Sequence, residues 1–233
     1  MSCIKYSIAL IISFNLLFSL GGIGVSGLTM SESVNYAETA APLELSYANN
    51  GTGLGGSFFI YFDALPMGFA IEYSKEIMSN PLNVQMTTES DSYDFGSGFP
   101  QAQVSDYFTV RKQMMELSIP ILAKGVLYVG GGLNKHKTVL PSIDLLKTII
   151  ENPNIDNAEL IDAFNTQKPS FNVSDFEDYF QDSSGAHIQA GIQVKVLMLS
   201  AFINARYTFI TDNSSQIDRA GFSNILLGLA WGL

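Results

Sequence analysis

Two histidines are the side chains best suited to acid–base chemistry near neutral pH. His136 lies in the segment "NKHKT", close in sequence to the hydroxyl groups of Thr138 and Ser142. A hydroxyl activated by an imidazole is the minimum for nucleophilic catalysis, and a lipid-modifying enzyme could use such a pair. His187 begins a segment of alternating polar and apolar residues, where hydrogen bonding is its expected role. A loop histidine beside hydroxyls is commonly just solvated, so we predict no catalytic residue and no enzyme.

The sequence predicts neither a metal site nor a cofactor. The two histidines lack the paired spacing of zinc ligands, and Cys3 is the single cysteine. The segment 135–185 is rich in acids, which are Asp144, Asp156, Asp162, Asp175, Glu177, Asp178 and Asp182. These acids lack the spacing of an EF-hand, so we interpret them as a solvated surface. The alternative is that divalent cations bridge them to lipid phosphates.

Four charged residues lie on the polar side of alternating segments: Glu72, Glu116, Lys195 and Arg206. Charges that are removed from water must be paired. We therefore predict that these four form an ion network of structural role in the lumen of a closed sheet. The alternative is a gated pore or a proton path.

The elements that position these residues are predicted from a period of two. Large apolar residues alternate with small or polar ones in eight segments, which is the pattern of β-strands with two different faces. The segments are 22–30, 53–63, 67–76, 115–124, 127–136, 187–196, 199–210 and 224–233.

The connections between these segments alternate between short and long. The long ones are 31–52, 77–110, 135–185 and 211–222. This alternation is typical of an up-and-down antiparallel sheet that crosses a membrane, with trimmed turns on one side and free loops on the other. Residues 139–181 have helical spacing instead, and Asp144 and Asp156 could start short helices there. We predict an ordered lid in this insertion, with a docking surface as the alternative.

The apolar face carries the large aromatic residues Phe58, Phe62, Phe69, Tyr73, Tyr207 and Trp231. The opposite face carries mostly glycine, alanine, serine and a few charges. Eight strands leave a lumen that side chains just fill, and small residues with paired charges suit that space. We therefore predict an all-β, eight-stranded antiparallel up-and-down transmembrane β-barrel whose aromatic residues face lipid.

Composition and the N-terminus agree with export to a membrane. Charged residues make up 15% of the chain, whereas soluble domains have about 25%. The net charge of −10 argues against nucleic acid as a partner. The stretch "MSCIKYSIALIISFNLLFSLGG" has a cation, an apolar run and small residues, which predicts a signal peptide over 1–21. The alternative is an anchoring helix. The barrel domain is then 22–233.

Several quoted stretches resemble a known family. "LELSYANNGTGLGGSFFIYF", "MELSIPILAKG", "LYVGGGL", "IQAGIQVKVLMLSAFINARYTF" and "ILLGLAWGL" are similar to the outer-membrane protein beta-barrel domain family. These are small porin-family barrels of the kind found in OmpA-like proteins. Two features depart from that family's pattern: the chain ends in Leu233 rather than an aromatic residue, and Pro120 falls within a strand.

The resemblance implies a barrel in the bacterial outer membrane, with outer-membrane lipid and the barrel-assembly machinery as partners. The resemblance says little about activity. With no convincing catalytic set, we predict a structural or surface-interaction role without catalysis, and the long loops are the candidate site for an extracellular ligand. One alternative is a narrow pore for small solutes or ions. Another is a secreted, soluble, ligand-binding β-barrel. The sequence does not indicate the oligomeric state.

Overall fold

A computed structural model describes residues 21–49, 52–118, 123–166, 178–196, 198–213 and 221–232. The strands are β1 (Gly21–Ser31), β2 (Asn35–Ala40), β3 (Leu43–Asn49), β4 (Gly53–Leu65), β5 (Phe69–Thr87), β6 (Ser92–Ser118), β7 (Ala123–Val139), β8 (Gln181–Val196), β9 (Leu199–Asn213) and β10 (Gly221–Gly232). The helices are η1 (Pro66–Gly68), α2 (Ile143–Ile149), η2 (Asn157–Glu159) and α3 (Leu160–Thr166). The signal peptide predicted over 1–21 lies outside the described residues, except for Gly21.

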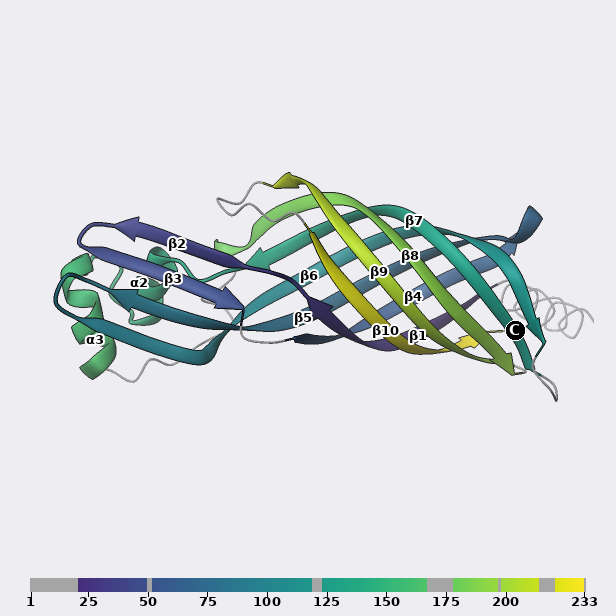
Figure 1. The fold of residues 1–233 in the computed structure, drawn as a ribbon, viewed down its shortest axis with the longest axis horizontal. Coiled ribbons are helices and arrows are strands. Elements are labelled where there is room, and N and C mark those ends of the chain that lie inside the picture. The colour runs from purple at the N-terminus through teal and green to yellow at the C-terminus, as the bar shows by residue number, and fades with distance from the viewer. Residues whose placement is uncertain are drawn as a thin grey trace, which may run out of the picture.

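Eight of these strands close into a barrel. The order is β5-β4-β1-β10-β9-β8-β7-β6, and β6 pairs again with β5. Every pair is antiparallel. Each joins two strands that follow one another among the eight barrel strands, or, for β1 and β10, the first and the last of them. The predicted fold class is therefore confirmed. We call the end with the η1 turn, where β1 begins and β10 ends, the short-turn end; the opposite end is the long-loop end (Figure 1).

Side chains alternate between the two sides of this wall. Along β10, Phe222, Asn224 and Leu226 are buried, whereas Ile225, Leu227 and Leu229 are exposed on the outside. The same alternation holds along β5 from Phe69 to Thr87 without a break. Large aliphatic and aromatic residues consequently cover the outside of the barrel, and the lumen receives the buried polar and charged residues together with two clusters of apolar and aromatic ones.

Two of the predicted long loops are not loops, and this part of the prediction was wrong. Residues 35–49 form β2 and β3, while β5 and β6 extend far beyond the barrel into the region predicted as the loop 77–110. β4 pairs with β5 only as far as Ser79, and β3 then takes its place beside 82–87. The result is a four-stranded sheet, β2-β3-β5-β6, that projects from the long-loop end (Figure 1).

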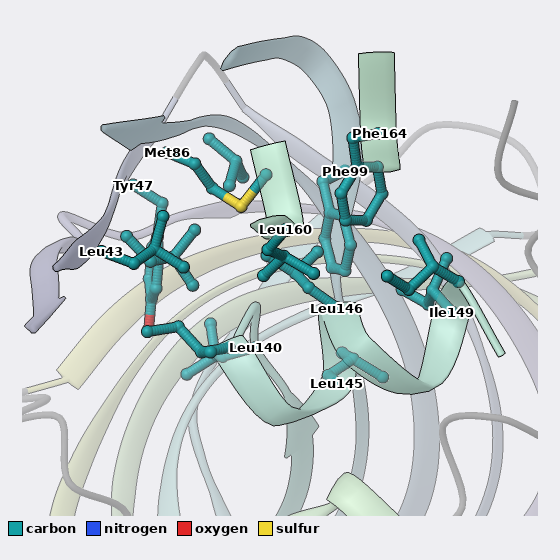
Figure 2. Close-up of a cluster of buried hydrophobic side chains, with 14 of the residues drawn as sticks. Leu43, Tyr47, Met86, Phe99, Leu140, Leu145, Leu146, Ile149, Leu160 and Phe164 are labelled. Atoms are coloured by element: carbon teal, nitrogen blue, oxygen red, sulfur yellow. The ribbon is translucent and has the colours of Figure 1, made fainter. Parts of the chain in front are cut away.

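Helices α2 and α3 cover one face of this projecting sheet. We call the sheet of β2, β3, 82–87 and 92–101, together with α2, η2 and α3, the head. Figure 2 shows the apolar core between them, to which Leu43, Met86, Phe99, Leu146 and Phe164 contribute. Leu145, Leu146 and Leu160 are completely buried. The helices thus give the sheet a packed core of its own outside the barrel.

Local capping fixes where the helices of the head begin. The Ser142 side chain accepts a hydrogen bond of 3.2 Å from the backbone N–H of Leu145, at the start of α2. The Asp156 side chain accepts one of 3.2 Å from Ala158 at the start of η2. Asp144, which was expected to start the first helix, lies in the first turn of α2, where its charge favours the helix dipole.

No helix within the described ranges is both long and apolar enough to cross a membrane.

Candidate functional site

The most enclosed charges of the barrel are Arg206 on β9 and Glu76 on β5. Arg206 Nη1 lies 2.5 Å from Glu76 Oε1, and both side chains have an exposed fraction of 0%. Arg206 Nε donates a hydrogen bond of 3.1 Å to Gln189 Oε1, and its guanidinium lies 4.0 Å from the centre of the Tyr107 ring. The cation is therefore held by a carboxylate, an amide and an aromatic face, which together compensate for lost hydration.

A second buried pair lies closer to the short-turn end. Arg111 Nη1 of β6 is 3.2 Å from Glu72 Oε2 of β5. The Arg111 guanidinium also lies 4.8 Å from the centre of the Tyr128 ring and 5.4 Å from that of Tyr61. Phe202 completes this aromatic surround, so the second cation is also enclosed by rings.

The remaining two residues of the predicted network lie at the short-turn mouth. Lys195 pairs with Asp63, and both are partly exposed. Glu116 is exposed and accepts a hydrogen bond of 3.3 Å from Gln113 Nε2. The predicted network of Glu72, Glu116, Lys195 and Arg206 therefore differs from the observed one. Three of the four do pair, but each with a partner outside the predicted set, and Glu116 lies at the rim, where water solvates it.

The partners that the sequence analysis missed are Asp63, Glu76 and Arg111. Asp63 and Glu76 have the inward parity of two segments already recognised as strands, so the period of two could have found them. Arg111 lies between the predicted loop 77–110 and the predicted strand 115–124, on a strand that is much longer than expected. Its alternation with buried Thr109 and Tyr107 is the signal that could have identified it.

Side chains fill the lumen between these pairs. The Phe202 ring packs edge-on against Phe59, with 5.4 Å between ring centres, and against Tyr61 at 5.6 Å. A cavity of about 10 Å³, enough for about one water molecule, lies in the middle of the lumen beside Ser26 and Ser57. A hollow of about 250 Å³ opens at the short-turn mouth and ends at Arg111 and Tyr128. Towards the head, an apolar layer of Met30, Met78, Phe222 and Leu226 crosses the lumen. The barrel is a packed core rather than an open channel.

His136 belongs to this packed interior and not to a solvated loop. Its Nδ1 lies 2.8 Å from Ser105 Oγ, and its Nε2 lies 2.8 Å from Asn134 Oδ1. A hydroxyl, an imidazole and an amide joined by successive hydrogen bonds are arranged like a catalytic triad. Ser105 is completely buried, however, so a substrate would have to displace the lumen packing to reach its hydroxyl.

The neighbours of the histidines have structural contacts. His187 Nε2 lies 2.9 Å from Thr109 Oγ1 in the lumen. Thr138 Oγ1 donates a hydrogen bond of 3.3 Å to Gln103, and Ser142 caps α2. Within the ranges that the structure describes, no group of three or more histidine, cysteine or acidic side chains could hold a metal ion. Asp175 and Glu177 of the acidic segment lie outside the described residues.

The outside of the barrel carries a continuous apolar belt. The six aromatic residues predicted to face lipid all point outward, with exposed fractions from 36% for Phe69 to 56% for Trp231. They are Phe58, Phe62, Phe69, Tyr73, Tyr207 and Trp231. Leu227, Leu229 and Leu133 are among the aliphatic residues between them, with exposed fractions of 61–69%. We call this surface the apolar belt. Soluble monomeric proteins do not ordinarily expose an apolar surface that encircles the whole molecule.

The head contains one acid whose titration is shifted. Burial raises the pKa of the Glu38 carboxyl on β2, a hydrogen bond from the backbone N–H of Ile143 lowers it, and the charge of Asp144 raises it. The net direction is upward. Glu38 joins β2 to the first residue of α2 at 3.2 Å, so it is a structural link within the head.

No protein-family model and no curated protein matches this chain. Among solved structures, it is similar to Ail, the attachment invasion locus protein of Yersinia pestis, at 10% identity and a TM-score of 0.42, covering 92% of this chain and 99% of that one. A second structure of Ail, in complex with the heparin analogue sucrose octasulfate, has 10% identity and a TM-score of 0.38, with coverage of 91% and 99%.

Proposed function

We propose that this chain is a non-enzymatic β-barrel protein of the bacterial outer membrane that holds a folded head outside the membrane for surface interaction. The apolar belt around a closed, polar-filled sheet is the observation that carries this proposal. Apolar side chains are stable on an outer surface only where that surface is not in contact with water. A lipid bilayer surrounds a barrel with apolar acyl chains on every side.

The alternative of a soluble ligand-binding barrel requires the opposite arrangement. Such a barrel would place its bulky apolar side chains inward around a ligand cavity. Here Leu227, Leu229 and Trp231 point outward, and the two arginines with their carboxylates occupy the interior. The sealed lumen likewise gives no support to the alternative of a narrow pore.

The head supports the surface-interaction part of the proposal. Its sheet is covered on one face by α2 and α3, whereas the other face is open and polar. Glu44, Ser46, Asn83 and Gln85 lie on that open face, at register positions shared by β3 and β5. Folding a packed core merely to connect two strands is unnecessary, so we assign the head the role of contacting molecules outside the cell.

The first test is heat modifiability of the detergent-extracted protein on a gel, together with far-UV circular dichroism. We expect unboiled and boiled samples to migrate differently and the spectrum to be rich in strand. As a matched pair, Leu229→Lys places a charge in the belt and Thr39→Lys places one on the head. Leu229→Lys should weaken membrane insertion by about 2–4 kcal/mol, and Thr39→Lys should not. A monodisperse protein in plain buffer, without a mobility shift, would contradict the membrane assignment.

The orientation is tested by labelling intact cells with a thiol reagent that cannot cross membranes. Thr39→Cys lies on the exposed surface of the head, and Lys124→Cys lies at the short-turn end. We expect the first variant to be labelled on intact cells and the second only after the membrane is disrupted. The reverse pattern would place the head on the inner side and would refute a surface role.

A further inference from the structure

A row of charged side chains marks the boundary of the apolar belt towards the head. Lys75 on β5, Asp106 on β6 and Lys135 on β7 are direct neighbours in the strand register, and all three point outward. Lys137 lies two residues further along β7, on the same outer face and beside Val104. The next row down, Tyr73, Phe108 and Leu133, belongs to the belt.

The acid in this row is already engaged. Asp106 Oδ1 accepts a hydrogen bond of 2.6 Å from the Tyr73 hydroxyl and lies 3.6 Å from Lys75 Nζ. Lys135 and Lys137, in contrast, have no carboxylate within ion-pair distance among the residues that the structure describes. The two neighbouring ammonium groups of Lys135 and Lys137 can therefore bind an anion at the head-side boundary of the apolar belt.

The surface around these lysines is hollowed in two adjoining parts. The upper hollow has a volume of about 610 Å³ and is lined by Lys75, Lys135 and Lys137, with Asp182 and Asp212 on the β8 and β9 side. The lower hollow has a volume of about 420 Å³ and is lined by Tyr73, Phe108 and Leu133. Asp106 and Lys135 border both parts, so the two form one groove that is charged above and apolar below.

We propose that this groove binds a membrane lipid with a phosphate in its headgroup. The phosphate contacts Lys135 and Lys137, whose cross-strand neighbours on β8 are Ser184 and Asp182, and an acyl chain lies along Phe108 and Leu133. Paired ammonium groups match the charge of a phosphate, and the lower hollow continues into the belt. The inference rests on the proposed function, since it requires the belt to face lipid.

A lipid fits this surface better than free phosphate does. A free phosphate would use only the upper hollow and would make no contact with Phe108 and Leu133 in the lower one. A lipid fills both parts and keeps its headgroup at the level where the wall changes from apolar to charged. The lysines therefore select the lipid by its headgroup, and the acyl chain in the lower hollow fixes how deep the lipid sits in the bilayer.

The test is native mass spectrometry of the detergent-solubilised chain, titrated with dioleoyl phosphatidylglycerol or with a phosphate-free glycolipid of the same chains. We expect the wild type to prefer phosphatidylglycerol. The double variant Lys135→Gln/Lys137→Gln should bind it about 30-fold more weakly, because each lysine near an anionic lipid surface contributes about 1 kcal/mol of attraction and two contribute about 2 kcal/mol. The control variant Lys124→Gln/Lys147→Gln removes the same charge elsewhere and should bind like the wild type.

Two results would overturn the inference. One is equal binding of phosphatidylglycerol to the double variant and the wild type. The other is displacement of the lipid by millimolar inorganic phosphate, which would indicate a headgroup site without a chain site. All variants are first checked for the heat-induced mobility shift in the same detergent. An intact shift with no lipid preference refutes only this site, whereas the absence of a shift in the wild type refutes the membrane barrel.

Discussion

At the scale of single residues, Glu76 and Arg206 are the most consequential pair. Both are completely enclosed, so neither can regain hydration when its partner is removed. An uncompensated buried charge costs about 3–5 kcal/mol, whereas a well-packed apolar replacement of both partners is often neutral. Each of the two charges therefore needs the other for the barrel to fold with a closed lumen.

We predict that Arg206→Met lowers the free energy of unfolding by about 3–5 kcal/mol and that Glu76→Leu/Arg206→Met restores most of it. The measurement is urea-induced unfolding from lipid vesicles. Lys75→Met is the matched control: it breaks the exposed pair with Asp106, and its effect should stay below about 1 kcal/mol. A single variant as stable as the wild type would show that water reaches the lumen.

The sequence was informative about which residues face inward, but not about which of them meet. Phe58 and Trp231 were placed correctly on the outer face because alternation alone assigns a side of the wall. Glu72 and Arg206 were placed on the inner face for the same reason. Arg206 meets Glu76 because the strand stagger brings β5 opposite β9 across the lumen, and no local pattern records that stagger. Glu72 meets Arg111 on the neighbouring strand β6, in a stretch that the sequence analysis did not assign to a strand.

At the scale of elements, α2 and α3 are too short to be stable on their own, since isolated helices of that length are marginal in water. Their stability comes from burying Leu146, Ile149 and Phe164 against the projecting sheet. Helical spacing in the sequence located both helices. The sheet that they cover was missed because Pro81 and Pro100, which lie opposite each other in β5 and β6, suggest a loop.

We predict that Leu146→Ala destabilises the head by about 2–5 kcal/mol and leaves the barrel intact. Leu146 is completely buried, and its truncation leaves a cavity in the core that Figure 2 shows. Hydrogen exchange should accelerate at residues 43–47 and 82–86, while the heat-induced mobility shift remains. Asn165→Ala, at an exposed position of α3, is the control. Simultaneous loss of the shift would mean that head and barrel fold as one cooperative unit.

At the scale of the whole molecule, the barrel is closed along its length. The Arg111 layer with its rings, the Arg206 layer and the apolar layer of Met30 and Phe222 follow one another along the lumen. An ion would have to displace all three to pass. We expect no reproducible conductance steps when the purified protein is added to a planar bilayer under a potential of either sign.

The control for that experiment is a sample of the same detergent without protein. Regular steps that depend on protein concentration would contradict the sealed lumen and would favour the alternative of a narrow pore. The overall barrel was predictable from strand period and loop lengths. A lumen filled by side chains was also expected from the strand number, but the residues that fill it were not, because the rings of Tyr61, Tyr128 and Phe202 surround Arg111 across the lumen.

β5 and β6 run side by side between the barrel and the head (Figure 1). A pull on the head, directed away from the barrel, acts along these strands. The ladders that join β5 to β4 and β6 to β7 in the barrel are then loaded in shear, so many hydrogen bonds resist together instead of opening one after another. Under the proposed function, a force on the head would therefore reach the barrel wall through two paired strands rather than through a single connecting loop.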